Sequence, residues 1–144
     1  MNDTMTSKSR TGFVILYAGC PLTWASRLQT ETALSTTEAE YMALSENTRT
    51  LLPLMDLLEE GQKHGIPIHS PTPTVRCRIF EDNAGALELA NVPKMRPRTR
   101  HINQKYHHFR EVLAVATKDQ LADQFTKGLG IQLFQDLRKR VMGW

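Results

Sequence analysis

The chain has 144 residues, a hydrophobic fraction of 40%, a charged fraction of 23% and a net charge of +3. These proportions are typical of one globular domain with a sizeable core, and they exclude a chain that is disordered, collagen-like or coiled-coil throughout. The positive excess is too small to indicate a partner, so the distribution of charge along the chain matters more than its sum.

The two cysteines, Cys20 and Cys77, lie far apart and lack the spacing of a metal site. One pair in a chain of this size favours a reducing compartment, with the thiols buried. No apolar run approaches the roughly 18 residues of a membrane span, and the polar N-terminus lacks the apolar stretch of a secretory signal. We therefore expect a soluble intracellular domain over residues 10–144, after a polar lead-in at residues 1–9.

The first predicted element is a β-hairpin. The run GFVILYAG, residues 12–19, is rich in aromatic and β-branched residues between two glycines, as is typical of a strand. The run CPLTWASRLQT, residues 20–30, alternates between two sets of side chains and predicts a second strand. The Gly19-Cys20-Pro21 corner predicts the turn between them.

A long helix is predicted to follow, ending at Gly61. Ser35 or Thr36 can act as its N-cap. Pro53 is expected to kink or break this helix, because proline lacks the backbone N–H of the helical ladder. Apolar residues at helical spacing form the stripe that faces the core: Tyr41, Leu44, Leu51, Leu52, Met55 and Leu58.

The second half of the chain mixes strands with helices. TVRCRIFEDN predicts a strand that ends at Asp82, with Val75, Cys77 and Ile79 on one face, and NAGALELAN predicts a short helix after it. VLAVAT predicts a very short strand, and DQLADQFTKGLG predicts a helix with Asp119 as its N-cap. FQDLRKRVMGW predicts a basic amphipathic helix at the end of the chain. Together with the hairpin, this order predicts an α/β fold of the α+β type, a mixed sheet with helices packed on its faces.

Three acidic residues have both a structural and a chemical interpretation. Glu40 lies on the edge of the buried helix stripe, whereas Glu38 is rotated about 200° away, but a glutamate in a first turn also suits the helix dipole. Asp82 ends a strand where α/β sheets bind ligands, or it is the N-cap of the next helix. Asp123 lies one turn into a later helix, where a solvated helix face is the alternative.

Taken together, the three carboxylates predict a shared site at one end of the sheet. Mg²⁺ prefers such hard oxygen ligands, and two ions about 3.5–4 Å apart can activate water and stabilise the leaving oxygen in phosphodiester hydrolysis. Zinc is not expected, because His101, His107 and His108 lack the i, i+4 spacing of a helical zinc pair and have no cysteine near them.

Positive charge is concentrated between residues 94 and 110, where prolines interrupt the chain. Arginines at alternate positions suit a phosphate backbone, and the alternative is a solvated loop followed by a helix whose basic side chains cover its surface. Six of the eighteen basic residues lie here: Lys94, Arg96, Arg98, Arg100, Lys105 and Arg110. The first five of these are the candidate nucleic-acid-binding residues.

The motifs SRTGFVILYAG, STTEAEY, FEDNAGALELA, RPRTRHINQKYHHFRE and TKDQLADQFTKGL, in this order, resemble the ribonuclease H domain of the Pol polyprotein of copia-type (pseudovirus) LTR retrotransposons. The resemblance covers roughly residues 8 to 144. It implies a mixed five-stranded sheet with helices on both sides, and Mg²⁺-dependent hydrolysis of the RNA strand of RNA–DNA hybrids. It also implies that Glu40, Asp82 and Asp123 are three of the four catalytic, metal-binding acids of the family.

Two departures from the family pattern reduce the expected activity. The first catalytic aspartate of the family lies on a strand upstream of SRTG, where this chain offers only Asp3 in a polar tail, and only VLAVATK remains of the last strand. We therefore expect a ribonuclease H-like fold that lacks its first strand, has a shortened last strand, and holds a two-ion Mg²⁺ site that is not fully formed. Catalysis is expected to be impaired, and the alternative is an inactive nucleic-acid-binding remnant or a gene fragment.

The resemblance also implies partners and a location. The partners are an RNA–DNA hybrid and the reverse transcriptase portion of the same polyprotein, and no membrane is involved. The location is the cytoplasm, in a retrotransposon particle, or the nucleus.

Overall fold

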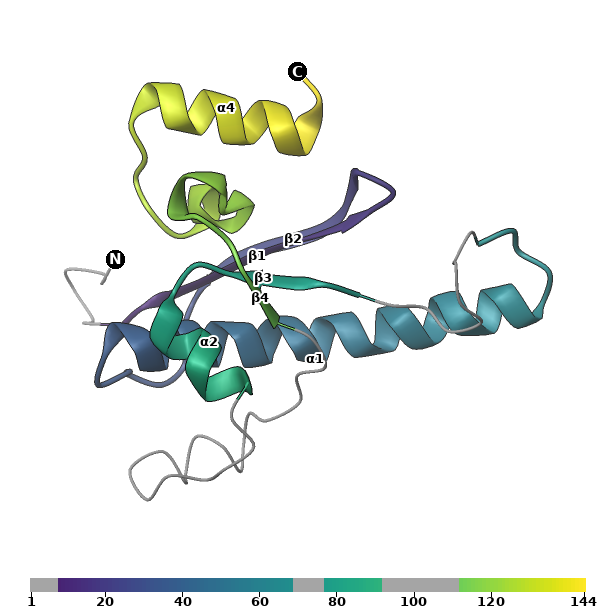
Figure 1. Ribbon diagram of the computed structural model, residues 1–144, viewed down its shortest axis with the longest axis horizontal. Helices are drawn as coiled ribbons and strands as arrows, with labels where there is room; N and C mark the ends of the chain where they lie inside the picture. Colours follow the sequence, from purple (N-terminus) through teal and green to yellow (C-terminus); the bar gives the residue numbers. More distant parts are fainter. Residues whose placement is uncertain (1–7, 69–76, 92–111) are drawn as a thin grey trace.

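The structure is a computed structural model that describes residues 8–68, 77–91 and 112–144 (Figure 1). These ranges contain mixed α/β structure, with two small sheets and three α-helices, and are compatible with a ribonuclease H-like fold. No helix within them has the length and apolar character needed to cross a membrane. The elements, in chain order, are β1 (Arg10–Tyr17), β2 (Cys20–Leu28), α1 (Thr36–Lys63), β3 (Ile79–Glu81), α2 (Ala84–Asn91), β4 (Val112–Ala114), η2 (Thr117–Asp119), η3 (Leu121–Phe125) and α4 (Ile131–Met142).

The predicted hairpin is confirmed, and its turn lies one position earlier than expected. β1 and β2 are antiparallel, and Phe13 and Ile15 of β1 are buried. Ala18 and Gly19 form the turn, with φ angles of 51° and 79°, and Cys20 already belongs to β2. Positive φ at both turn residues suits the right-handed twist of the two strands.

The thiols were expected to be buried, and this is wrong for Cys20, which is exposed. Cys77 is half-buried, and burial raises its pKa above the ordinary value of 9.0. Neither cysteine forms a disulfide.

α1 begins where its N-cap was predicted. The Ser35 hydroxyl accepts a hydrogen bond from the backbone N–H of Glu38 at 3.1 Å. The helix continues past Gly61 to Lys63, and His64 occupies its C-terminal cap. The chain then turns at Gly65, whose φ of 85° favours glycine.

Of the kink or break expected at Pro53, the break is wrong, because α1 runs through this position as one helix of 28 residues (Figure 1). Leu51 before the proline is buried, and Leu54 and Met55 after it pack against the same hydrophobic core. Packing on both sides of Pro53 therefore holds the helix together, while the ring itself is exposed.

β3 and β4 form a second sheet. They pair in parallel, with Ile79 opposite Val112 and Glu81 opposite Ala114. β3 ends one residue before Asp82, and β4 has the short length predicted for it. In the described ranges this pair is not hydrogen-bonded to the hairpin, so the predicted mixed sheet consists of an antiparallel half and a parallel half.

The α-helix predicted for DQLADQFTKGLG is wrong, because this segment forms the two short 3₁₀ helices η2 and η3. Asp119 caps no helix there and forms an ion pair with Arg140 of α4, with 2.9 Å between Oδ1 and Nη1. The amphipathic C-terminal helix is confirmed as α4, which buries Leu137 and Val141.

Candidate active site

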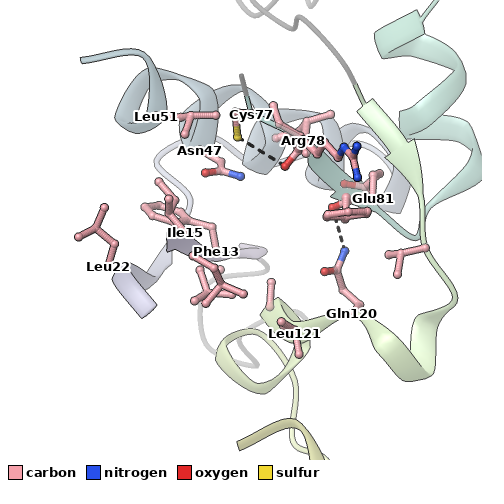
Figure 2. A pocket seen from close by; sticks show the side chains of 18 of the residues that line it. Phe13, Ile15, Leu22, Asn47, Leu51, Cys77, Arg78, Glu81, Gln120 and Leu121 are labelled. Carbon is pink, nitrogen blue, oxygen red and sulfur yellow. Dashed lines mark hydrogen bonds between the residues drawn. The ribbon is translucent and has the colours of Figure 1, made fainter. Parts of the chain in front are cut away.

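A cavity of about 1010 Å³ lies between α1, β1, the β3 segment and the 3₁₀ segment (Figure 2). Apolar side chains of α1, such as Leu44 and Leu51, line one side of it. The three acids predicted from the sequence, Glu40, Asp82 and Asp123, line the cavity as well. The structure therefore brings these residues to one hollow from three separate elements.

Glu40 comes from the second turn of α1. Its neighbours Ala39 and Tyr41 are buried in the core, and Glu40 itself is half-buried at the cavity. Burial raises the pKa of Glu40 above its ordinary value of 4.5, and the negative charges of Asp82 and Asp123 raise it further, against the opposing charge of Lys127. Glu40 thus lies within electrostatic range of both other acids.

Asp82 follows β3 directly and is half-buried at the cavity. The sequence left open whether Asp82 caps the following helix. Asn83 takes that role, because its side-chain oxygen accepts a hydrogen bond from the N–H of Ala86 at 3.0 Å. The carboxylate of Asp82 is therefore not used as this cap.

Asp123 lies in η3 and is buried, with 6% of its surface exposed. Its carboxylate accepts a hydrogen bond from the Lys127 ammonium, with 2.9 Å between Oδ1 and Nζ. Burial raises the pKa of Asp123 above 3.8, while Lys127 opposes the shift and Asp82 adds to it. The solvated helix face considered for Asp123 is thus wrong.

Lys127 is the positive charge of this cluster, and the sequence analysis did not single it out. Burial by itself lowers the pKa of Lys127, but the hydrogen bond with Asp123 and the charges of Asp123, Asp82 and Glu40 raise it above 10.5 overall. The sequence spacing could have predicted the ion pair, because Lys127 lies four residues after Asp123. The electrostatic interaction of Lys127 with the other two acids depends on the tertiary fold.

Glu81 is a fourth acid that the sequence analysis missed. It is 6% exposed, and its carboxylate accepts a hydrogen bond from the N–H of Asn83 at 2.9 Å. Burial raises the pKa of Glu81 to about 8, with further contributions from Glu40 and Asp82. Strand alternation was the available signal, since Glu81 falls on the same face as the inward Ile79.

The donor chemistry of this cluster suits a hard divalent cation, but its spacing does not form a complete metal site. Carboxylate oxygens are the ligands that Mg²⁺ prefers. Within the described ranges, however, no three histidine, cysteine, aspartate or glutamate side chains lie close enough to share one ion. The two-ion Mg²⁺ site therefore stays a prediction.

The five predicted nucleic-acid-binding residues lie outside the described part of the chain. They are Lys94, Arg96, Arg98, Arg100 and Lys105, all within residues 92–111. Their role therefore stays a prediction.

The fold and site define a mixed α/β protein with a carboxylate-lined cavity, and the chain is similar to parts of much longer proteins. The retrovirus-related Pol polyprotein from transposon TNT 1-94 of Nicotiana tabacum is 33% identical over 149 residues, which covers 98% of this chain. Those from transposons RE2 and RE1 of Arabidopsis thaliana are 33% and 32% identical and cover 96% and 92% of it.

The chain spans only 9–10% of the length of these relatives. No family model and no solved structure matches the chain. The similarities nevertheless extend over nearly all of its residues. They support a segment derived from a retrotransposon Pol polyprotein, as the motifs indicated.

Proposed function

We propose that this chain is the ribonuclease H-like portion of a copia-type Pol polyprotein and takes part in Mg²⁺-dependent hydrolysis of the RNA strand of RNA–DNA hybrids. The observation that carries this proposal is the placement of Glu40, Asp82 and Asp123 along one cavity, where both aspartates raise the pKa of Glu40 and Asp82 also raises that of Asp123. The similarity to transposon Pol polyproteins supports the proposed source of the chain. Such a protein would act in the cytoplasm, in a retrotransposon particle, or in the nucleus.

The chain by itself is expected to have weak activity. The coupled carboxylates concentrate negative charge where a divalent cation would be held, but the described residues do not form a complete set of ligands. We propose that a further acidic residue, which the family resemblance places on an upstream strand, completes the site. Lys127 provides a positive charge beside Asp123.

We propose that the basic segment holds the nucleic acid. Arginine and lysine side chains contact phosphates without regard to sequence, so binding should weaken steeply as salt concentration rises. The partners in this proposal are the RNA–DNA hybrid and the reverse transcriptase portion of the same polyprotein.

The proposal is tested by incubating a hybrid labelled on its RNA strand with the chain and Mg²⁺. We expect slow cleavage of the RNA strand by the unaltered chain and cleavage at background level in Asp82→Asn, which removes a charge from the cavity with little change of shape. Asp56→Asn, at an exposed position of α1 outside the cavity, is the matched control and should cleave like the unaltered chain.

The other outcomes separate the alternatives. Cleavage that persists in Asp82→Asn would contradict the assignment of the site. Salt-sensitive binding of the hybrid without cleavage would identify an inactive binding remnant. Neither binding nor cleavage would contradict both functions.

A further inference from the structure

The hairpin leaves the second edge of β2 unpaired. In the described ranges β2 is hydrogen-bonded to β1 alone, and its 9 residues make it a long edge strand (Figure 1). Proteins usually protect such an edge with charged side chains, with proline or by keeping the strand short. Arg27 is the only charged residue of β2, and its Nε forms an ion pair with Oε1 of Glu46 in α1 at 2.8 Å. Pro21 protects only the start of the strand.

The hydrogen-bonding register shows which residues of β2 face this free edge. The N–H of Gln29, just after β2, donates to the carbonyl of Ser9, just before β1, at 2.9 Å. Hydrogen-bonded pairs alternate along an antiparallel ladder, so Arg27 and Ala25 also direct their backbone groups to β1. The residues between them direct their N–H and C=O groups to the free edge. These residues are Trp24, Ser26 and Leu28.

The same residues present their side chains on the face of β2 opposite α1. Ala25 packs against the hydrophobic core, so its neighbours point the other way, and the hydroxyl of Ser26 donates a hydrogen bond to the carbonyl of Phe125 in η3. Trp24 is 55% exposed and Leu28 is 38% exposed, although α4 packs against this strand. The centre of β2 thus combines free backbone groups with exposed apolar side chains at the same positions.

We propose that this edge pairs with the same edge of a second copy of the chain, as antiparallel strands related by a two-fold axis at Ser26. The N–H and C=O groups that face the free edge then bond to each other across the axis. The two hairpins join into one continuous antiparallel sheet.

A second copy suits this edge because the exposed side chains are placed symmetrically about Ser26. Trp24 and Leu28 each lie two residues from it, so Trp24 of one copy lies opposite Leu28 of the other, and this pair occurs twice. Cross-strand pairs of an aromatic and an aliphatic side chain stabilise a sheet, and the small Ser26 side chains meet at the axis. Both Arg27 side chains lie on the opposite face, where Glu46 neutralises them.

The oligomeric state of the full 144-residue chain tests the proposal. We expect sedimentation equilibrium to show a monomer–dimer equilibrium that Trp24→Lys weakens about tenfold, because this substitution removes both cross-strand pairs. Leu57→Lys replaces an apolar residue of α1 that is 67% exposed. It is the matched control and should dimerise like the unaltered chain.

Amide hydrogen exchange locates the contact in the unaltered chain, so this measurement does not depend on the folding of a variant. The N–H groups of Ala25 and Arg27 are bonded to β1 and should exchange slowly in the monomer and in the dimer. Those of Trp24, Ser26 and Leu28 should exchange rapidly in the monomer and slow down as the concentration rises. This alternation is specific to pairing at the free edge of β2.

A chain that stays monomeric up to about 1 mM would leave the edge to a strand of another protein and would overturn the proposal. Dimers in which the N–H groups of Trp24 and Leu28 still exchange rapidly would overturn it as well, because the contact would then lie elsewhere on the molecule. The same holds for dimers that Trp24→Lys leaves as tight as before. Slow exchange of these groups in the monomer would show that the chain itself covers the edge, and would also contradict the proposal.

Discussion

Glu81 and Asp82 are adjacent in the chain and have different surroundings. Glu81 is the last residue of β3 and is buried. Its pKa of about 8 keeps it largely protonated at neutral pH. Asp82 is half-buried and is not needed as the cap of α2, because Asn83 takes that position. Both residues line the cavity, Glu81 as a buried carboxyl group and Asp82 as a half-buried one.

The raised pKa of Glu81 predicts how stability depends on pH. Its folded-state value of about 8 lies above the ordinary 4.5, so the folded chain binds the proton more tightly and the free energy of unfolding falls between these two values as pH rises. From pH 5 to pH 8 we expect a loss of about 2–4 kcal/mol, measured by urea denaturation. Glu81→Gln is neutral throughout and should remove most of this loss.

Glu40 and Asp123 also have raised pKa values, so a smaller decline of the same sign should remain in Glu81→Gln. Asp56→Asn, at an exposed position of α1, should keep the full decline and serves as the control. Equal pH dependence in Glu81→Gln and the unaltered chain would show that burial of Glu81 does not set the slope.

At the scale of secondary structure, the start of α1 offers a clear comparison. Ser35 and Thr36 were equally plausible N-caps in the sequence, and the structure gives the capping hydrogen bond to Ser35. Ser35→Ala should therefore lower the free energy of unfolding by about 1 kcal/mol, because the N–H of Glu38 loses its acceptor. Thr36→Ala lies inside the helix and should have a much smaller effect. Chemical denaturation of both variants measures the difference, and equal effects would contradict the assignment.

Periodicity predicted the elements that bury part of one face in the core. This holds for the hairpin, for α1 with its buried Tyr41 and Leu44, and for α4 with Leu137. It could not predict the continuity of α1 at Pro53, because the contacts that hold the helix there come from other parts of the chain.

The 3₁₀ segment shows the same limit. The sequence of this segment is typical of an α-helix. In the structure, however, η3 packs so closely against β1 that a side chain at Gly12 would collide with Thr126. The hydroxyl of Ser26 in β2 also donates a hydrogen bond to the carbonyl of Phe125. The 3₁₀ segment therefore contacts the hairpin, which lies almost a hundred positions earlier in the chain. The local sequence pattern carries no information about these contacts.

At the scale of the whole molecule, the candidate site depends on how separate elements come together. The sequence could place Glu40 on an inward helix edge and Asp82 after a strand, but no spacing rule relates either of them to Asp123. The structure brings the three to one cavity between two half-sheets.

The central claim is that Glu40, Asp82 and Asp123 act as one electrostatic unit, and an NMR titration of the Glu40 carboxyl tests it most directly. Both aspartates raise the pKa of Glu40, so that pKa should fall in Asp82→Asn and in Asp123→Asn and stay unchanged in Asp56→Asn. A Glu40 pKa that is the same in all three variants as in the unaltered chain would contradict the claim.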